Sequence, residues 1–280
     1  MAESVIITTL SENSAIGKCI GEWGLSILIE ADGVKVLFDT GRSFTAVLNA
    51  QTLGVDLSDV DKLVLSHGHY DHTGGLKDIV IRSGDIEIIA HPNAWAPKYK
   101  YLLDQEPQYI GIPYPQAELE ALGATLTFSK QPVAISEDVI TTGEIPQTTD
   151  FESIDTVLCV QDGANYTKDD LLDDQALIIK TDDGLVVVLG CAHRGVINTL
   201  LYAQKITGID RINAIIGGLH LMHASEEYMN RVIDELRKFD IKIVAASHCT
   251  GFTGSCQLHQ AFGDKFILNN SGTILILPAV

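Results

Sequence analysis

No long hydrophobic run occurs in this 280-residue chain, although 46% of its residues are hydrophobic. No segment reaches the roughly 18 consecutive apolar residues that a membrane-spanning helix needs. The first residues, MAESVIITTL, also lack the basic stretch and the apolar core of a secretory signal peptide. We therefore expect a cytoplasmic protein that does not associate with a membrane.

Basic residues and cysteines are both scarce. Lysine and arginine together number 19, against 37 aspartates and glutamates, and the formal net charge is −18. Because nucleic acids are bound through basic surfaces, this charge argues against a DNA or RNA partner. The five cysteines are scattered and odd in number, which is typical of reduced thiols rather than a disulfide framework. A small-molecule substrate fits these constraints, and a homo-oligomer is compatible with them.

The chain repeats one pattern of elements. Residues 24–41 and 175–195 each read as two strands joined by an Asp-Gly turn, which is a strong hairpin signal. Each hairpin is followed by a helix, a strand, a second helix and a second strand. The expected helices cover residues 44–53, 74–82, 196–206 and 226–239, and the expected strands cover 62–67, 86–92, 212–221 and 242–248.

The two halves predict an α/β fold, specifically a four-layer αββα sandwich. The strands are continuous runs of Val, Ile and Leu, which indicates sheets that are covered on both faces. The expected helix 226–239 has one apolar stripe, so it covers an outer sheet face. We expect a single domain over residues 1–280, with halves near 1–145 and 175–280. A hairpin over 266–278 ends the chain.

Two stretches, 93–123 and 146–174, interrupt the repeat. The second is strongly acidic, and the first is rich in aromatic residues and proline. We expect both to form long loops or lids, because long loops in a compact domain are often functional. Trp95, Tyr99 and Tyr101 are the predicted wall of a substrate pocket.

The sequence LSHGHYDHTGG, at residues 65–75, carries three of the nine histidines. On an extended segment residues two apart point the same way, so His67 and His69 can share one metal ion. The turn that follows lets Asp71 and His72 face a second position. Imidazole and carboxylate suit zinc, iron or manganese. We predict one or two divalent ions, with zinc as the first choice.

This motif, after a strand and before a glycine-rich helix start, resembles that of the metallo-β-lactamase superfamily. The αββα repeat agrees with the resemblance, which then covers essentially the whole chain. In the segment FDTG, Asp39 resembles the aspartate that the family places at a strand end beside the metal site. The resemblance implies that Asp39 orients a ligand histidine.

The remaining ligands must come from the second half. By resemblance, His248 in AASHCTG is the final histidine ligand. Most relatives also have a histidine before the second hairpin and a bridging aspartate after it, but this chain has no histidine between His91 and His193. We predict His193 as the ligand, with Cys191 as the alternative because thiolate is a good soft ligand. His220 either binds the metal or donates a proton.

The segments GCAHRGVINTL, IIGGLHL and SHCTG resemble one branch of the superfamily more closely. It includes the archaeal 7,8-dihydropterin-6-methyl-4-(β-D-ribofuranosyl)-aminobenzene-5'-phosphate synthase. The leading hypothesis is a metal-dependent hydrolase of an ester or phosphoester, in which Asp71 or His220 handles the proton. A transferase that joins a dihydropterin methyl diphosphate to an aminobenzene ribose phosphate is the alternative. A non-catalytic metal or ligand sensor is a third hypothesis.

Overall fold

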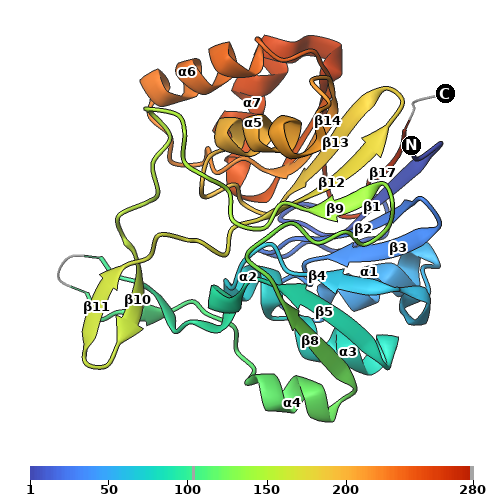
Figure 1. Cartoon of the computed structure of the whole chain (residues 1–280), viewed down its shortest axis with the longest axis vertical. Helices are drawn as coiled ribbons and strands as arrows, with labels where there is room; N and C mark the ends of the chain where they lie inside the picture. The colour runs from blue at the N-terminus through green and yellow to red at the C-terminus, as the bar shows by residue number, and fades with distance from the viewer. Residues whose placement is uncertain (103–104, 278–280) are drawn as a thin grey trace.

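The computed structural model describes residues 1–102 and 105–277, which build two large sheets packed face to face (Figure 1). The first sheet has the order β17-β1-β2-β3-β4-β5-β8. Its strands are β17 (Ile274–Leu277), β1 (Val5–Ser11), β2 (Ser26–Ala31), β3 (Val34–Phe38), β4 (Lys62–Val64), β5 (Ile86–Ala90) and β8 (Ala124–Phe128).

The second sheet has the order β16-β15-β14-β13-β12-β9 and repeats the design of the first. Its strands are β16 (Phe266–Leu268), β15 (Ile241–Ser247), β14 (Ile212–Gly218), β13 (Gly184–Leu189), β12 (Ala176–Thr181) and β9 (Val139–Thr141). In each half an antiparallel hairpin, β2–β3 or β12–β13, continues into parallel strands. The predicted repeat is therefore present.

Helices cover the outer faces of both sheets (Figure 1). On the first sheet these are α1 (Thr45–Leu53), α3 (Leu76–Ser83) and α4 (Gln116–Ala121), and on the second α5 (Val196–Thr207), α6 (Glu226–Leu236) and α7 (Gly251–Phe262). The shorter helices are α2 (Tyr70–Thr73), η1 (Leu57–Asp59), η2 (Pro92–Trp95), η3 (His248–Thr250) and η4 (Gly263–Lys265). The fold is thus the α/β four-layer αββα sandwich that the sequence predicted.

The core between the sheets is apolar and draws on both halves. Ile27 and Phe38 from the first sheet belong to one buried cluster with Val186 and Ile216 from the second. This explains why the strands read as continuous apolar runs, because each faces a sheet on one side and helices on the other. Burial of such side chains contributes roughly 1.5–3 kcal/mol each, so this layer holds the two halves in fixed relation.

The prediction of a hairpin at the C-terminal end of the chain was wrong. The tail does not form a hairpin, because β16 pairs with β15 in the second sheet and β17 pairs with β1 in the first. Asn269 anchors the crossing between them: its backbone N–H donates to Ala246, and its side chain accepts a hydrogen bond from Thr9. Polar anchors of this kind give no periodic signal in the sequence.

The two insertions are also more ordered than loops. Strands from both of them form a third sheet with the order β11-β10-β6-β7, which projects from the sandwich in Figure 1. These strands are β11 (Asn165–Lys168), β10 (Leu158–Asp162), β6 (Lys98–Lys100) and β7 (Gln108–Tyr109). Their pairing joins segments some 60 residues apart, from Tyr99 to Cys159, which local sequence patterns do not reveal.

Candidate metal centre

The histidine-rich motif lies in the loop after β4 and in the short helix α2. The expected strand 62–67 ends at Val64, so His67 and His69 do not lie on a regular strand. They still meet, since His67 Nε2 and His69 Nδ1 are 2.9 Å apart. Asp71 and His72 follow on α2 and not on an open turn.

Gly68 lets this loop pass close to the chain after β5. A Cβ atom at this position would collide with the carbonyl oxygen of Ala94, so the site requires glycine. The Gly68 N–H donates a 2.8 Å hydrogen bond to Asp173 Oδ2. The other oxygen of Asp173 accepts from Lys98, which also binds Asp169 and is 1% exposed. A buried ion network from the two insertions therefore supports the loop.

Asp39 fixes the orientation of His72. It follows β3 with a left-handed backbone (φ 61°), a conformation that aspartate tolerates better than most residues. Its carboxylate is 2.7 Å from His72 Nδ1 and accepts hydrogen bonds from the N–H and the Oγ of Ser66. His72 Nε2 is thereby directed toward the interior of the cluster, as expected for a ligand that a carboxylate orients.

The second half supplies side chains from the ends of three neighbouring strands. Cys191 and His193 follow β13, His220 follows β14, and His248 begins η3 after β15. His220 and His248 have left-handed backbones (both φ 54°). Such conformations are costly outside glycine and cluster at functional sites. They turn the chain so that these side chains face the motif of the first half.

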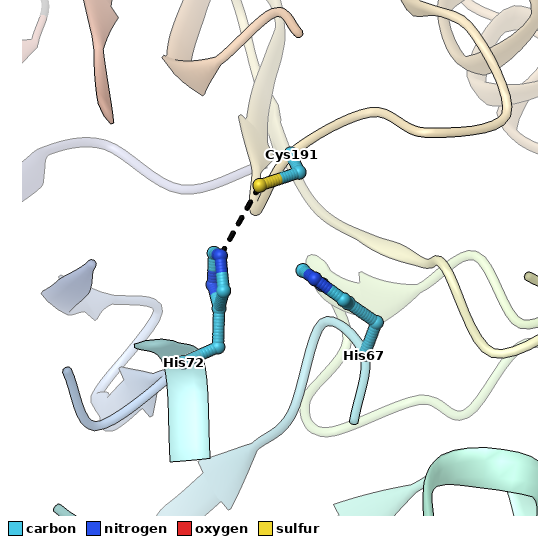
Figure 2. A group of neighbouring side chains, drawn as sticks. All are labelled: His67, His72 and Cys191. Carbon is cyan, nitrogen blue, oxygen red and sulfur yellow. Dashed lines mark hydrogen bonds between the residues drawn. The ribbon is translucent and has the colours of Figure 1, made fainter. Parts of the chain in front are cut away.

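Potential donor atoms form five overlapping groups of three, each with its members within 4.8 Å of one another, and two of these groups, here called the triads, share no residue. One triad is His67, His69 and His193, and the other is Asp71, His72 and His248. Cys191 lies between them, because it also groups with His67 and His72 (Figure 2). Its Sγ is 3.2 Å from His72 Nε2. His193, Cys191 and His220 form a further group, so every residue predicted as a ligand lies in one cluster.

The cluster fits divalent metal ions. His69 Nε2, both ring nitrogens of His193 and His248 Nε2 are buried and have no hydrogen-bond partner among the described residues. Buried polar atoms are normally satisfied, so orphaned nitrogens that converge on one region call for a ligand. Imidazole nitrogen, carboxylate and thiolate are the donors that zinc takes in proteins.

Electrostatics of the cluster favour the metal-binding form of several imidazoles. Burial holds the pKa of His67 and His193 well below the usual value and lowers the pKa of His69 to about 3. These rings are therefore neutral, which is the form that binds a metal. For His72 burial acts in the same direction, but the adjacent Asp39 outweighs it and raises the pKa to about 9. A bound cation would repel the positive charge of the protonated ring and so lower the pKa of His72.

A cavity of about 460 Å³ opens beside the cluster. His69, Asp71, His193 and His220 reach it, and its other walls include the three aromatic residues Trp23, Tyr70 and Tyr228. A volume in this range suits a small molecule.

The predicted aromatic wall lies elsewhere, since the lining of this cavity does not include Trp95, Tyr99 or Tyr101. Trp95 donates to the carbonyl of Tyr114 and packs against Phe128. Tyr99 packs against the rings of Tyr109 and Tyr166 in the third sheet, and Tyr101 is half exposed. These rings stabilise the insertion itself because they find partners within it and beside it.

Comparison with known proteins decides the family. The profile of the metallo-β-lactamase superfamily matches residues 24–248, a span that includes both triads. The chain belongs to the metallo-β-lactamase superfamily. Members of this superfamily usually bind divalent metal ions, in agreement with the cluster.

Three full-length relatives narrow the position of the chain within the superfamily. An uncharacterized protein of Methanocaldococcus jannaschii is 33% identical over 96% of this chain and 99% of its own length. The 7,8-dihydropterin-6-methyl-4-(beta-D-ribofuranosyl)-aminobenzene-5'-phosphate synthase of the same organism is 32% identical over 98% and 97%. The crystal structure of a metal-dependent hydrolase of the β-lactamase superfamily superposes with a TM-score of 0.83, 27% identity and coverage of 97% and 98%.

Sequence reasoning missed several residues of the centre. Cys249 was missed, although its position directly after His248 in the segment SHCTG was a usable signal. Its donor atom groups with those of Cys191 and His248. Ser66 and the Lys98–Asp173 pair were also missed, because their contacts cross from one segment to another.

Among the described residues no helix is both long enough and apolar enough to cross a membrane.

Proposed function

We propose that this metallo-β-lactamase superfamily protein is a metal-dependent hydrolase of a small ester or phosphoester. The observation that carries the proposal is the pair of donor triads at the wall of the 460 Å³ cavity. Water and a small substrate can meet there beside groups that hold metal. The negative net charge argues against a nucleic-acid substrate.

Each triad would hold one ion in this proposal. His67, His69 and His193 would hold the first, and Asp71, His72 and His248 would hold the second, with zinc as the preferred metal because five of these six donors are imidazoles. A divalent ion in such a site supplies Lewis acidity and lowers the pKa of a water molecule toward about 7. Asp39 keeps His72 in place through its 2.7 Å contact with Nδ1.

His220 is the better placed of the two residues predicted to handle a proton. Asp71 belongs to the second triad, so in this proposal its carboxylate would bind the metal. His220 lines the cavity, and its buried Nδ1 has no hydrogen-bond partner in the described structure. We assign to His220 the proton that the leaving group requires.

The cavity wall favours a substrate with a flat ring and an anionic group. Trp23, Tyr70 and Tyr228 offer aromatic surfaces, and Lys100 offers a positive charge on the same wall. An aromatic face binds rings with little loss of conformational entropy, and a lysine attracts phosphate or carboxylate. These properties also suit the second candidate.

The second candidate is a transferase that joins a dihydropterin methyl diphosphate to an aminobenzene ribose phosphate. It is favoured by the 32% identity with the archaeal synthase, which extends over 98% of this chain. The metal centre would then face the diphosphate leaving group, whose developing charge needs stabilisation.

One experiment separates the two candidates. Diphosphate release is measured from hydroxymethyl-dihydropterin diphosphate, with and without the aminobenzene ribose phosphate, using anaerobically purified protein of known metal content. Release that requires the amine and is lost in His67→Ala supports the transferase. If none occurs, panels of phosphodiesters, thioesters and lactones test the hydrolase. Failure of the metal-loaded protein on every panel would contradict the hydrolase proposal.

A further inference from the structure

Cys249 is the thiol of the cluster that was not predicted as a ligand, and like Cys191 it lies outside the two triads. It lies in η3 directly after His248, is 5% exposed and is also part of the cavity wall. Its Sγ accepts a hydrogen bond from the His220 N–H at 3.3 Å and lies 3.5 Å from the carbonyl oxygen of Cys191. The side chain is therefore held in a fixed position inside the centre.

Donor atoms of Cys249, Cys191 and His248 all lie within 4.8 Å of one another. His248 Nδ1 contacts Asn13 at 3.1 Å, which leaves the buried and unpartnered Nε2 as the donor on this side. Both cysteines are free thiols. Three potential ligands thus converge, and the buried His248 Nε2, which has no hydrogen-bond partner in the described structure, links this group to the second triad.

The two triads carry too little negative charge to compensate two divalent ions, which favours thiolate ligands. The first triad consists of neutral imidazoles, and the second contains a single carboxylate, Asp71. Two divalent ions would bring a large positive charge into a buried site, which is unfavourable without compensation. No aspartate follows β13, where Cys191 stands instead. Thiolates supply the missing negative charge and bind zinc or iron strongly.

We propose that Cys249 Sγ is a metal ligand, which together with Cys191 and His248 gives the second metal position a sulfur-rich face. This position would select zinc or iron(II) over the harder ions manganese and magnesium. The assignment rests on the metal centre of the proposed function, but it does not depend on the substrate.

Cobalt(II) tests the assignment without an activity assay. Metal-free protein, kept reduced and anaerobic, is reconstituted with cobalt(II), whose ligand-field bands report binding and whose near-ultraviolet charge-transfer band reports thiolate ligation. Cys249→Ser is expected to lose about half of the charge-transfer intensity of the wild type, because one of two thiolates is removed. Cys191→Ser should lose a similar part. Cys256→Ser, which removes an exposed thiol, is the matched control and should keep the whole band.

Two results would overturn the assignment in distinguishable ways. Ligand-field bands with an unchanged charge-transfer band in Cys249→Ser would remove Cys249 from the ligand set and leave the metal centre intact. Failure of the wild type to bind cobalt or zinc would remove the metal centre, and the assignment with it.

A second measurement uses only the wild-type chain, in case the variant does not fold. Zinc-loaded and metal-free proteins are alkylated with iodoacetamide, and the modified cysteines are identified by mass spectrometry. Cys249 faces the cavity, so it should react in the metal-free protein and be protected by zinc about tenfold or more, as expected for a bound thiolate. Cys256 should react equally in both. Equal reaction of Cys249 in both proteins would overturn the assignment.

Discussion

The two halves of the sandwich share one design but supply the centre in different ways. The first half places His67, His69, Asp71 and His72 on a single loop and its short helix. The second half supplies its donors from the ends of three strands, β13, β14 and β15. The loop of the first half is supported from outside by the insertions, whereas the second half relies on left-handed backbones at the strand ends.

This difference has a physical consequence. Each triad contains residues from both halves, so neither half holds a complete site. The apolar layer between the sheets fixes their separation, and the donor cluster follows the ends of strands from both sheets. Changes in the first half should therefore disturb several ligands together, and changes in the second half should disturb one ligand at a time.

The largest effect is expected for His67→Ala. His67 belongs to the first triad and also groups with His72 and Cys191, so its loss should affect both metal positions. We expect metal content to fall and activity to drop by at least about 100-fold. His259→Ala removes an exposed histidine and is the control. Full metal content and activity in His67→Ala would contradict the account.

His220→Gln should separate chemistry from metal binding in the second half. If His220 supplies a proton, kcat falls by about 10²–10⁴-fold while metal content stays at the wild-type level. Activity is measured across pH, because loss of the acid also removes one limb of the pH–rate profile. Loss of metal in this variant would instead make His220 a ligand.

Lys98→Met tests the support of the first-half loop. The substitution leaves the buried carboxylates of Asp169 and Asp173 without their partner. Asp173 also accepts a hydrogen bond from the Gly68 N–H. We expect the free energy of unfolding to fall by about 3–5 kcal/mol. Chemical denaturation measures it, and Lys242→Met, which breaks an exposed pair with Asp183, is the matched control. Equal stability of the two variants would show that the buried network is dispensable.

Asp39→Asn should have the smallest effect of the four. Asparagine tolerates the left-handed backbone, so the fold is retained while the charged contact with His72 is lost. Metal affinity should fall by about 10–100-fold. Competition with a chromophoric chelator measures the affinity. Asp32→Asn, in the turn between β2 and β3, is the control. An equal loss of metal affinity in this variant would show that the effect does not depend on the contact between Asp39 and His72.

The fold was predicted correctly from the sequence, and the candidate ligands that it named lie in one cluster, because both leave local signals. Apolar runs, Asp-Gly turns and the helical stripe of 226–239 reveal the αββα repeat. The spacing of His67, His69, Asp71 and His72 predicts a metal site by itself. His193, His220 and His248 could be placed because each follows a predicted strand.

Features that depend on contacts between distant segments could not be predicted. The third sheet pairs Tyr99 with Cys159, and the chain end crosses from one sheet to the other at Asn269. The cavity wall was misplaced for the same reason, since Trp23 and Tyr228 come from regions without an unusual pattern. Cys249 was adjacent to a predicted ligand, but only the structure shows that its donor atom lies with those of Cys191 and His248.

The metal content of three proteins tests the central claim most directly. The account predicts about two zinc ions per wild-type chain and about one in each of His193→Ala and His248→Ala, because each variant removes a ligand from a different triad. Elemental analysis of reconstituted, desalted protein gives these values. A wild-type chain that retains no metal, or variants that both keep the wild-type content, would contradict a centre assembled from the two halves.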